Sequence, residues 1–302
     1  MNYDLAIIGG GAAGMAAAVF ASERGVRTVV IEHNRQLGKK LAITGKGRCN
    51  VTNNSDNDNI MKNIPTGSRF LYSALAGFSA YDTMNFFEGL GVPLKTERGN
   101  RVFPVSDSAK DIVEALKKRM CTLGVKVITA HAKGVITGRV KGVRLGESEV
   151  YANSVIIATG GASYSGTGSD GSGYELLSAF GHRVNRTFPA IVQLTADTKK
   201  TKPLAGIKWV CGVTARAGRQ SRTELGEVLF TDYGLSGPPV LQVSRIISKN
   251  GSGQIILDLC PDLSKQQIES EIAARAAAFS NRDCMELLTG FINKRLGQTA
   301  VK

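Results

Sequence analysis

The sequence has few of the residues that build metal centres and disulfide frameworks. Its five cysteines are an odd number and include no C-x-x-C pair, which argues against a disulfide framework, a zinc site and the dithiol chemistry of disulfide reductases. Only three histidines are present, and because His33, His131 and His182 are not clustered in the sequence, we expect no metal site. Cys49 is predicted to be a buried apolar residue rather than a redox thiol.

Long apolar runs are also scarce. Residues 5–21 form the one uncharged stretch that approaches membrane length. No Lys or Arg precedes it, as a secretory signal would require, and its glycines would suit a lipid-exposed helix poorly. Because the sequence shows no export or lipidation signal, we expect a cytoplasmic protein without a membrane partner.

Acidic and aromatic residues are under-represented. The chain has 25 acidic against 38 basic residues, a formal net charge of +13, and 6% aromatic residues. Such a surplus attracts nucleic acids or other anionic ligands. The basic residues are spread along the chain without a Lys/Arg-rich run or aromatic interleaving, so we interpret them as a generally basic surface and do not expect a nucleic-acid partner.

Glycine, by contrast, is abundant, and three glycines near the start follow the spacing G-x-G-x-x-G. The apolar, β-branched residues 5–8 predict a buried parallel strand, and residues 12–24 have the composition of a helix. Residues 28–31 predict a second strand that ends at Glu32. Glycines between a strand and a helix, with an acid closing the next strand, indicate a dinucleotide-binding βαβ unit.

Each residue type in this motif has a physical function. Gly9 permits the tight turn, Gly11 lets a pyrophosphate approach the backbone, and Gly14 lets the helix pack closely on the strand. The free amides and the positive end of the helix dipole then face the phosphates. Glu32 can accept hydrogen bonds from ribose hydroxyls and would repel a 2′-phosphate, which disfavours NADP but leaves FAD and NAD open.

The rest of the first half is consistent with an α/β core. Residues 33–59 predict a long Gly/Lys-rich loop with a mobile tip at residues 55–59. A helix is expected from residue 109, with Ser106 as its N-cap. Residues 154–158 predict another buried strand, and the turn Thr159-Gly160-Gly161 follows it at the edge where a doubly wound sheet binds its ligand.

The character of the sequence changes near residue 186. Strand-like segments at residues 191–194, 208–214 and 228–231 alternate with turns and predict an antiparallel layer. Residues 264–279 and 284–296 are expected to be helical. We therefore predict an FAD- or NAD-binding Rossmann-type domain at residues 1–186 and an inserted, β-rich and helical domain at residues 187–302.

Several of these motifs resemble the bacterial BaiN-type flavoproteins, also described as the aminoacetone-oxidase family of FAD-dependent enzymes. The resemblance rests on IIGGGAAGMAAA, GKKLAITGKGRCNVTN, NRVFPVSDSAKDIVEAL, VIIATGGASYSGTGSDGSGYELLSAFGH and GEVLFTDYGLSGPPVLQVSR. Together these stretches span nearly the whole chain. The resemblance implies an α/β fold like that of glutathione reductase, with an inserted β-rich domain.

The resemblance also implies FAD as the cofactor and a set of residues that hold it. These residues are Gly9, Gly11, Ala12, Ala13, Gly14, Glu32, His33, Lys39, Arg48, Asn50, Val51, Ala132, Lys133, Thr159, Gly160 and Gly161. Among them, the backbone of Ala132 and Lys133 would meet the adenine. No acid–base residue is nominated.

The resemblance predicts an FAD-dependent oxidoreductase that transfers a hydride to or from a small organic substrate, with NAD(P)H or oxygen as redox partner. The family's C-terminal block, with a GE…D…GGYN pattern, is not found, and we therefore expect a truncated chain. One alternative is a nucleotide-binding fragment without catalytic competence. Another is a basic RNA-binding adaptor, which the net charge alone suggests.

Overall fold

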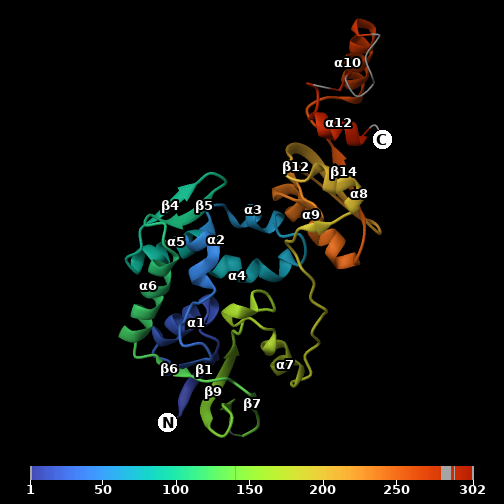
Figure 1. Cartoon of the computed structure of the whole chain (residues 1–302). Coiled ribbons are helices and arrows are strands. Elements are labelled where there is room, and N and C mark those ends of the chain that lie inside the picture. The colour runs from blue at the N-terminus through green and yellow to red at the C-terminus, as the bar shows by residue number, and fades with distance from the viewer. Residues whose placement is uncertain (1, 140, 280–286, 289, 301–302) are drawn as a thin grey trace. The chain divides into compact units, whose positions relative to one another are not determined.

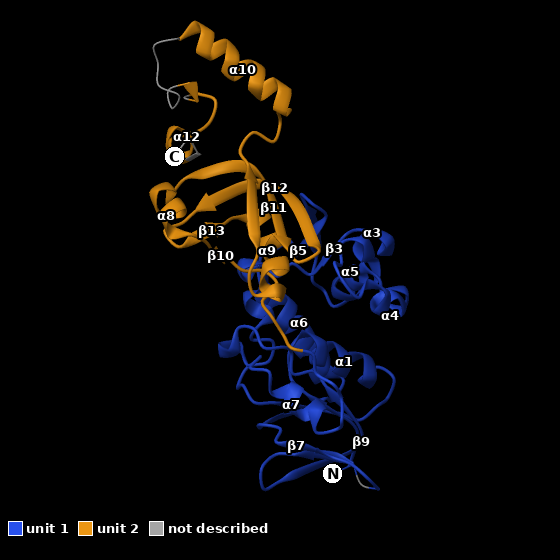
Figure 2. Ribbon diagram, turned by 90° about the vertical axis from the view of Figure 1, so that its right-hand side faces the viewer, with its two compact units in different colours: residues 1–185 blue, residues 186–302 orange. Residues whose placement is uncertain are grey.

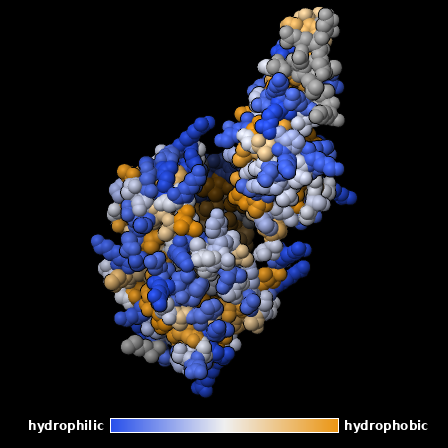
Figure 3. Space-filling view, viewed as in Figure 1, coloured by the Kyte–Doolittle hydropathy of each residue, from blue (hydrophilic) through white to orange (hydrophobic). Residues whose placement is uncertain are grey.

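The chain divides into two compact units, Met1–Asn185 and Arg186–Lys302 (Figure 2). The computed structural model describes residues 2–139, 141–279, 287–288 and 290–300. Figure 3 shows hydrophilic and apolar side chains interspersed over the face of the first unit that it presents. Each unit has its own hydrophobic core and is described separately below.

The first unit is built on a six-stranded sheet with the order β6-β2-β1-β9-β8-β7 (Figure 1). The pairs β6–β2, β2–β1 and β1–β9 are parallel, whereas β9–β8 and β8–β7 are antiparallel. The strands are β1 (Tyr3–Ile8), β2 (Thr28–Glu32), β6 (Lys126–Thr129), β7 (Gly134–Ile136), β8 (Gly142–Arg144) and β9 (Glu149–Ile157). A parallel centre with an antiparallel edge confirms the predicted Rossmann-type fold class.

The two longest helices of this unit pack together beside the sheet. Helix α1 (Ala12–Ser22) and helix α6 (Ala109–Thr122) contribute Met15, Val19, Leu116 and Met120 to a buried cluster with Leu5, Ile7 and Val30 of the strands. Five fully or nearly fully buried positions of α6 recur at helical spacing, and this recurrence is why the sequence folds as an amphipathic helix here.

Shorter elements complete the first unit. They are the 3₁₀ turns Leu41–Ile43, Ser68–Leu71 and Ser165–Thr167, the helices α2 (Thr44–Gly47), α3 (Asn57–Lys62), α4 (Tyr72–Gly77), α5 (Ala80–Gly89) and α7 (Ser172–Ser178), and a small antiparallel sheet of β3 (Thr52–Asn53), β5 (Arg101–Pro104) and β4 (Leu94–Glu97).

Two local predictions are wrong. The expected loop tip at residues 55–59 instead starts helix α3, because the Asp56 carboxylate accepts a hydrogen bond from the Asn59 amide and caps the helix. The N-cap of α6 is Ser108 rather than Ser106, and its side chain makes no capping hydrogen bond.

The second unit contains a five-stranded antiparallel sheet with the order β10-β13-β12-β11-β14. Its strands are β10 (Leu194–Thr195), β11 (Lys208–Ala217), β12 (Gln220–Phe230), β13 (Gly234–Ser236) and β14 (Gln254–Asp258). The helices are α8 (Thr198–Thr201), α9 (Pro238–Asn250), α10 (Lys265–Ala278) and α12 (Lys294–Ala300), with a 3₁₀ turn at Lys202–Leu204.

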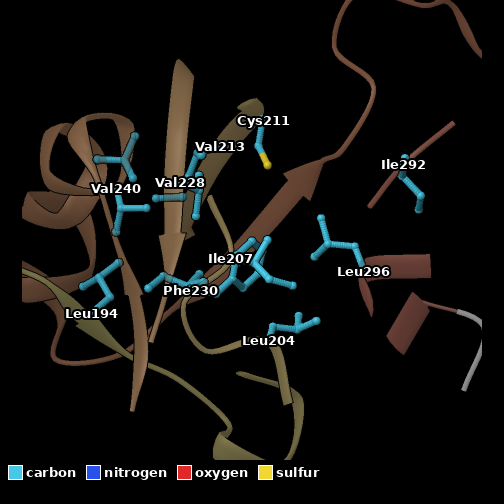
Figure 4. Close-up of a cluster of buried hydrophobic side chains, with 13 residues drawn as sticks. Leu194, Leu204, Ile207, Cys211, Val213, Val228, Phe230, Val240, Ile292 and Leu296 are labelled. Carbon is cyan, nitrogen blue, oxygen red and sulfur yellow. The ribbon is translucent and has the colours of Figure 1, made fainter. Parts of the chain in front are cut away.

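Helix α9 covers one face of this sheet. Val240 of α9 and Val213, Val228 and Phe230 of the strands belong to one buried cluster, and their labelled side chains lie together in Figure 4. The antiparallel layer was predicted, although β11 and β12 are longer than the sequence indicated. The strand expected at residues 191–194 is wrong in its bounds, because β10 starts only at Leu194. Part of the helix expected at residues 284–296 lies outside the described residues, and within them α12 starts only at Lys294.

Candidate functional site

The turn between β1 and α1 depends on glycine for two different reasons. A Cβ on Gly9, which has φ +107°, would lie 2.5 Å from the Ala158 carbonyl oxygen, and a Cβ on Gly14 would lie 1.8 Å from the Gly9 carbonyl oxygen. Close packing between backbones therefore excludes a side chain at both positions. A Cβ on Gly11 would meet no atom within 4 Å, so its open side leaves room for a ligand.

At the start of helix α1, no side chain neutralises the positive end of the helix dipole or caps the free amides. Its N-cap is Gly11, which has no side chain to cap the amides, and its first turn has no acidic residue. The Met15 amide bonds to the Gly11 carbonyl oxygen at 2.9 Å. The amides of Ala12 and Ala13 precede that bond, so they and the helix dipole can serve an anionic ligand.

Glu32 at the end of β2 is buried and held from two sides. Its Oε2 accepts a 2.7 Å hydrogen bond from the Gly10 amide, and its Oε1 accepts 2.8 Å bonds from the backbone and side-chain amides of Asn34. These bonds fix the carboxylate beside the glycine turn. A carboxylate retains further lone pairs, so it can still accept hydrogen bonds from a sugar diol.

A second glycine turn follows β9 and faces the first. Gly160 has φ +78°, and a Cβ there would lie 2.6 Å from Ser169 Oγ. A Cβ on Gly173, at the start of α7, would lie 1.9 Å from Thr159 Oγ1. The loop after β9 therefore folds back tightly on its own turn.

These elements surround a cavity of about 410 Å³ at the carboxyl ends of β1, β2, β6 and β9. Eleven predicted cofactor residues line it: Gly9, Gly11, Ala12, Ala13, Glu32, His33, Lys39, Ala132, Thr159, Gly160 and Gly161. The remaining five, Gly14, Arg48, Asn50, Val51 and Lys133, are not part of its lining. Gly14 lies behind the turn, where it packs against Gly9.

Arg48 is engaged away from the cavity. Its Nη2 lies 2.5 Å from Glu97 Oε1 and 2.6 Å from Asp107 Oδ1, and its guanidinium carbon lies 4.1 Å from the centre of the Phe103 ring. Hydrogen bonds from Arg48 hold the pKa of Glu97 below its ordinary value. Those from Lys95 and Arg48 do the same for the pKa of Asp107.

Two other predicted residues serve the backbone framework. The Val51 amide donates to the Val102 carbonyl oxygen at 2.8 Å, which joins the loop to β5. The Lys133 amide donates to the Arg144 carbonyl oxygen at 2.8 Å. Cys49 is 2% exposed, and burial raises the pKa of its thiol, so the prediction of a buried apolar residue is confirmed.

The structure adds residues that the sequence reasoning missed. Gly10, Asn34, Gly38 and His131 also line the cavity. The histidines are not clustered in the sequence, but the rings of His33 and His131 are 5.5 Å apart because β2 and β6 are neighbours in the sheet. The order of strands, which brings residues 33 and 131 together, has no local signal in the sequence.

The geometry fits the adenosine diphosphate part of a dinucleotide. An uncapped helix start, an open glycine and a fixed carboxylate are the groups that a pyrophosphate and a ribose require. Among the described residues, no group of three or more His, Cys, Asp or Glu side chains is arranged to hold a metal ion. In the same part of the chain, no helix is both long and apolar enough to cross a membrane.

Comparison with known proteins gives concordant results. Residues 3–288 match the family described as "HI0933-like protein Rossmann domain". The chain is 33% identical to the 3-dehydro-bile acid delta(4,6)-reductase of Clostridium scindens, over 97% of this chain and 73% of that protein. It is 30% identical to the ribosomal RNA dihydrouridine synthase of Escherichia coli, over 98% of this chain and 72% of that protein.

Among solved structures, that of THI4 from Thermovibrio ammonificans aligns over 80% of each chain with 12% identity and a TM-score of 0.40. The family match and the bile-acid reductase confirm the resemblance inferred from the motifs. The chain therefore belongs to the HI0933-like family, and it is a Rossmann-fold oxidoreductase.

Proposed function

We propose that this protein binds FAD in the cavity at the carboxyl edge of its parallel sheet and reduces a carbon–carbon double bond conjugated to a carbonyl group. The amides of Ala12 and Ala13 and the turn Thr159-Gly160-Gly161 would hold the diphosphate, with Lys39 supplying positive charge. Glu32 would hold the ribose, with His33 and Ala132 close to the adenine end. Lys133 and Asn50 would contribute from outside the cavity lining.

The observation that carries this proposal is the chemistry shared by two relatives with different names. A 3-dehydro-bile acid delta(4,6)-reductase acts, by its name, on ring double bonds conjugated to a 3-ketone. A dihydrouridine synthase, by its name, adds two hydrogens to the C5–C6 double bond of a uracil ring, which is conjugated to the C4 carbonyl, and so converts it to a single bond. Both names describe the addition of two electrons and two protons to an activated alkene.

This chemistry assigns different roles to the cofactor and to the protein. Bound FAD, once reduced, would supply the hydride that such an alkene accepts, and the protein's task would be to bind, orient and shield the reactants. A nicotinamide is the reductant we propose. The small organic substrate expected from the sequence remains our first candidate because the relative with the higher identity is named for a bile acid.

A uridine in ribosomal RNA is the second candidate. Two observations favour it: the net charge of +13 and the two relatives named as ribosomal RNA dihydrouridine synthases, at 30% and 27% identity. A surplus of basic residues supplies the attraction that RNA phosphates require. Nucleic acid was not expected as a partner from the sequence, so this candidate differs from that expectation.

An absorption spectrum of the purified chain tests the first part of the proposal. We expect a yellow protein that bleaches when NADH or NADPH is added without oxygen. A 3-oxo-Δ4 bile acid and an unmodified ribosomal RNA transcript are then supplied to the bleached protein. The expected result is return of the colour with one of them and a product heavier by two hydrogens. A colourless protein would overturn the cofactor assignment, and a bleached protein that neither compound reoxidises would overturn the proposed reaction.

A further inference from the structure

Residues 62–81 expose aromatic side chains of a kind that folded proteins usually bury. Phe70 is 88% exposed, Tyr72 62% and Tyr81 69%. Neither the 3₁₀ turn Ser68–Leu71 nor helix α4 contributes a buried residue. A single exposed ring is ordinary, but three large rings left in water within one short stretch indicate a surface that receives a partner. We call Phe70, Tyr72 and Tyr81 the exposed rings.

The segment that carries the exposed rings is anchored to the first unit. The Phe78 ring packs edge-on against Phe20 of α1, with 5.3 Å between the ring centres, and its centre lies 6.2 Å from that of Phe86 on α5. The Asn57 side-chain amide donates a 2.9 Å hydrogen bond to the Leu75 carbonyl oxygen, which ties α4 to α3. In the described part of the chain, the exposed rings make no ring contact or side-chain hydrogen bond of their own. Their faces therefore remain available.

The charge within this segment has one sign. Lys62 and Arg69 are exposed, and residues 59–81 contain no Asp or Glu. The next acid, Asp82, is engaged in the capping box of α5, where its carboxylate accepts hydrogen bonds from the amide and the hydroxyl of Ser79. Aromatic residues interleaved with basic ones were not expected from the sequence. This segment differs from that expectation because the fold leaves its rings outside the core.

We propose that the exposed rings stack on unpaired bases of a single-stranded RNA segment and that Lys62 and Arg69 bind its phosphates. Every base has a flat π face, so aromatic side chains beside cations form a platform for single-stranded nucleic acid. A lipid surface fits less well, because a membrane-surface helix presents a strongly amphipathic apolar face and α4 has only six residues. This inference rests on the RNA candidate of the proposed function for its choice of partner, and it adds the surface that would hold the RNA.

Fluorescence anisotropy of a labelled, unstructured oligouridine of about ten nucleotides measures this binding. Phe70→Ala and Tyr72→Ala should each weaken it about fivefold or more, as loss of one stacked base does. Phe70→Leu keeps an apolar side chain without a π face and should weaken binding as much, whereas Phe70→Trp should bind at least as tightly as wild type. Tyr151→Ala is the matched control, because Tyr151 is an exposed ring whose hydroxyl bonds Glu149. The control should leave RNA binding unchanged.

The two cations are tested by the salt dependence of binding. Lys62→Gln and Arg69→Gln should each weaken binding at low salt and reduce the slope of log Kd against log salt concentration by about 0.7, as loss of one phosphate contact on a single strand does. The ring variants should leave that slope unchanged, because stacking releases no counterions. ADP affinity and the Tm should stay close to wild type in all these variants, which locates the loss at the RNA surface.

Phe70→Trp also reports whether the surface is free. The chain has one tryptophan, Trp209, so the difference from the wild-type spectrum gives the emission of the new ring. That emission should be typical of a tryptophan in water and should be quenched by acrylamide, and added RNA should protect it from the quencher. A shielded emission before RNA is added would show that another part of the protein covers the ring, and this result would overturn the inference.

Two further results would overturn it. One is wild-type RNA affinity in Phe70→Leu, and the other is binding to vesicles of phosphatidylglycerol and phosphatidylcholine but not to RNA. The binding assay needs neither FAD nor turnover, so it is separate from the proposed reaction. A yellow protein that reduces a 3-oxo-Δ4 bile acid but does not bind RNA would refute this inference alone. A colourless protein that binds RNA through the exposed rings would refute only the cofactor assignment.

Discussion

Two glycines of the turn after β1 have opposite surroundings. One of them should therefore affect mainly the stability of the fold, and the other mainly the binding of a ligand. Gly14 is in contact with the Gly9 backbone, whereas Gly11 faces open space. Backbone atoms cannot yield to a new Cβ as a flexible side chain can. The same motif therefore contains one glycine that the fold requires and another whose requirement comes from the ligand.

Substitution of each glycine by alanine should show this separation. Gly14→Ala places a Cβ 1.8 Å from the Gly9 carbonyl oxygen, and we expect a loss of about 3 kcal/mol or more in the free energy of unfolding. Gly11→Ala should stay within about 1 kcal/mol of wild type, yet weaken ADP binding at least tenfold by obstructing the approach of the pyrophosphate. Denaturant unfolding of the ligand-free protein and ADP titration measure the two effects. Equal losses of stability in the two variants would contradict this interpretation.

The cysteines differ in the ionisation of their thiols. Burial, aided by Asp258 and Cys260, raises the pKa of Cys211 to about 11. Its thiolate fraction at pH 8 should be about a hundredfold lower than that of an ordinary cysteine, and burial likewise lowers it for Cys49. Cys121 is exposed. With a thiol reagent at pH 8 followed by peptide mapping, we expect Cys121 to be labelled well before Cys49 and Cys211. Labelling of Cys211 first would show that its pocket opens in solution.

Between elements, Arg48 joins the turn at α2 to the sheet of β4 and β5 through ion pairs with Glu97 and Asp107, and Lys95 also pairs with Asp107. These four residues are called the Arg48 clamp. Hydrogen bonds from Arg48 and Lys95 lower the pKa values of Glu97 and Asp107 in the folded protein. A carboxylate with a lowered pKa contributes stability above its unfolded-state pKa and loses that contribution as pH falls through the folded value. The clamp is thus predicted to contribute its full stabilisation at neutral pH and to lose this stabilisation only in acid.

The pH dependence of Arg48→Met tests that prediction. The difference in Tm between wild type and this variant should be constant from pH 7 to about pH 5 and should shrink as pH falls below about 4, where the carboxylates take up protons. Thermal melts at a series of pH values measure it. A background with Glu97→Gln and Asp107→Asn is the control, because there the difference should not vary with pH. A difference that persists unchanged to pH 2.5 in the wild-type background would refute the role of these carboxylates.

The elements near the start were predictable because their signals are local. Apolar residues, three glycines and an acid within thirty residues define β1, α1, β2 and Glu32. The partners of Arg48 could not be inferred in this way, since Glu97 and Asp107 come 49 and 59 residues later and meet it only in the folded chain. The meeting of His33 with His131 likewise depends on strand order. The helix at α3 was missed because its capping residue, Asp56, lies in a polar stretch typical of loops.

At the scale of the whole molecule, the two units are joined by a segment without helix or strand. Residues 182–193 contain no helix or strand, and Arg183 and Arg186 are exposed there. The core clusters of the described residues each fall within a single unit, and the cavity lining extends from Ile8 to Leu176, wholly within the first. The residues that line the cavity therefore all belong to the first unit.

Limited digestion with trypsin should reveal this organisation. We expect the first cuts after Arg183 or Arg186, because exposed segments without secondary structure are the preferred sites of proteolysis. The N-terminal fragment should keep ADP affinity within about threefold of the intact chain, a difference under 1 kcal/mol, since every residue lining the cavity stays on it. Saturating ADP should slow further digestion of that fragment without slowing the first cut, because the ligand stabilises only the unit that binds it. Mass spectrometry locates the cuts and calorimetry measures the binding. First cleavage within residues 2–176 would contradict the expected accessibility of the joining segment, and loss of ADP binding when that segment is cut would show that the first unit does not bind ADP alone.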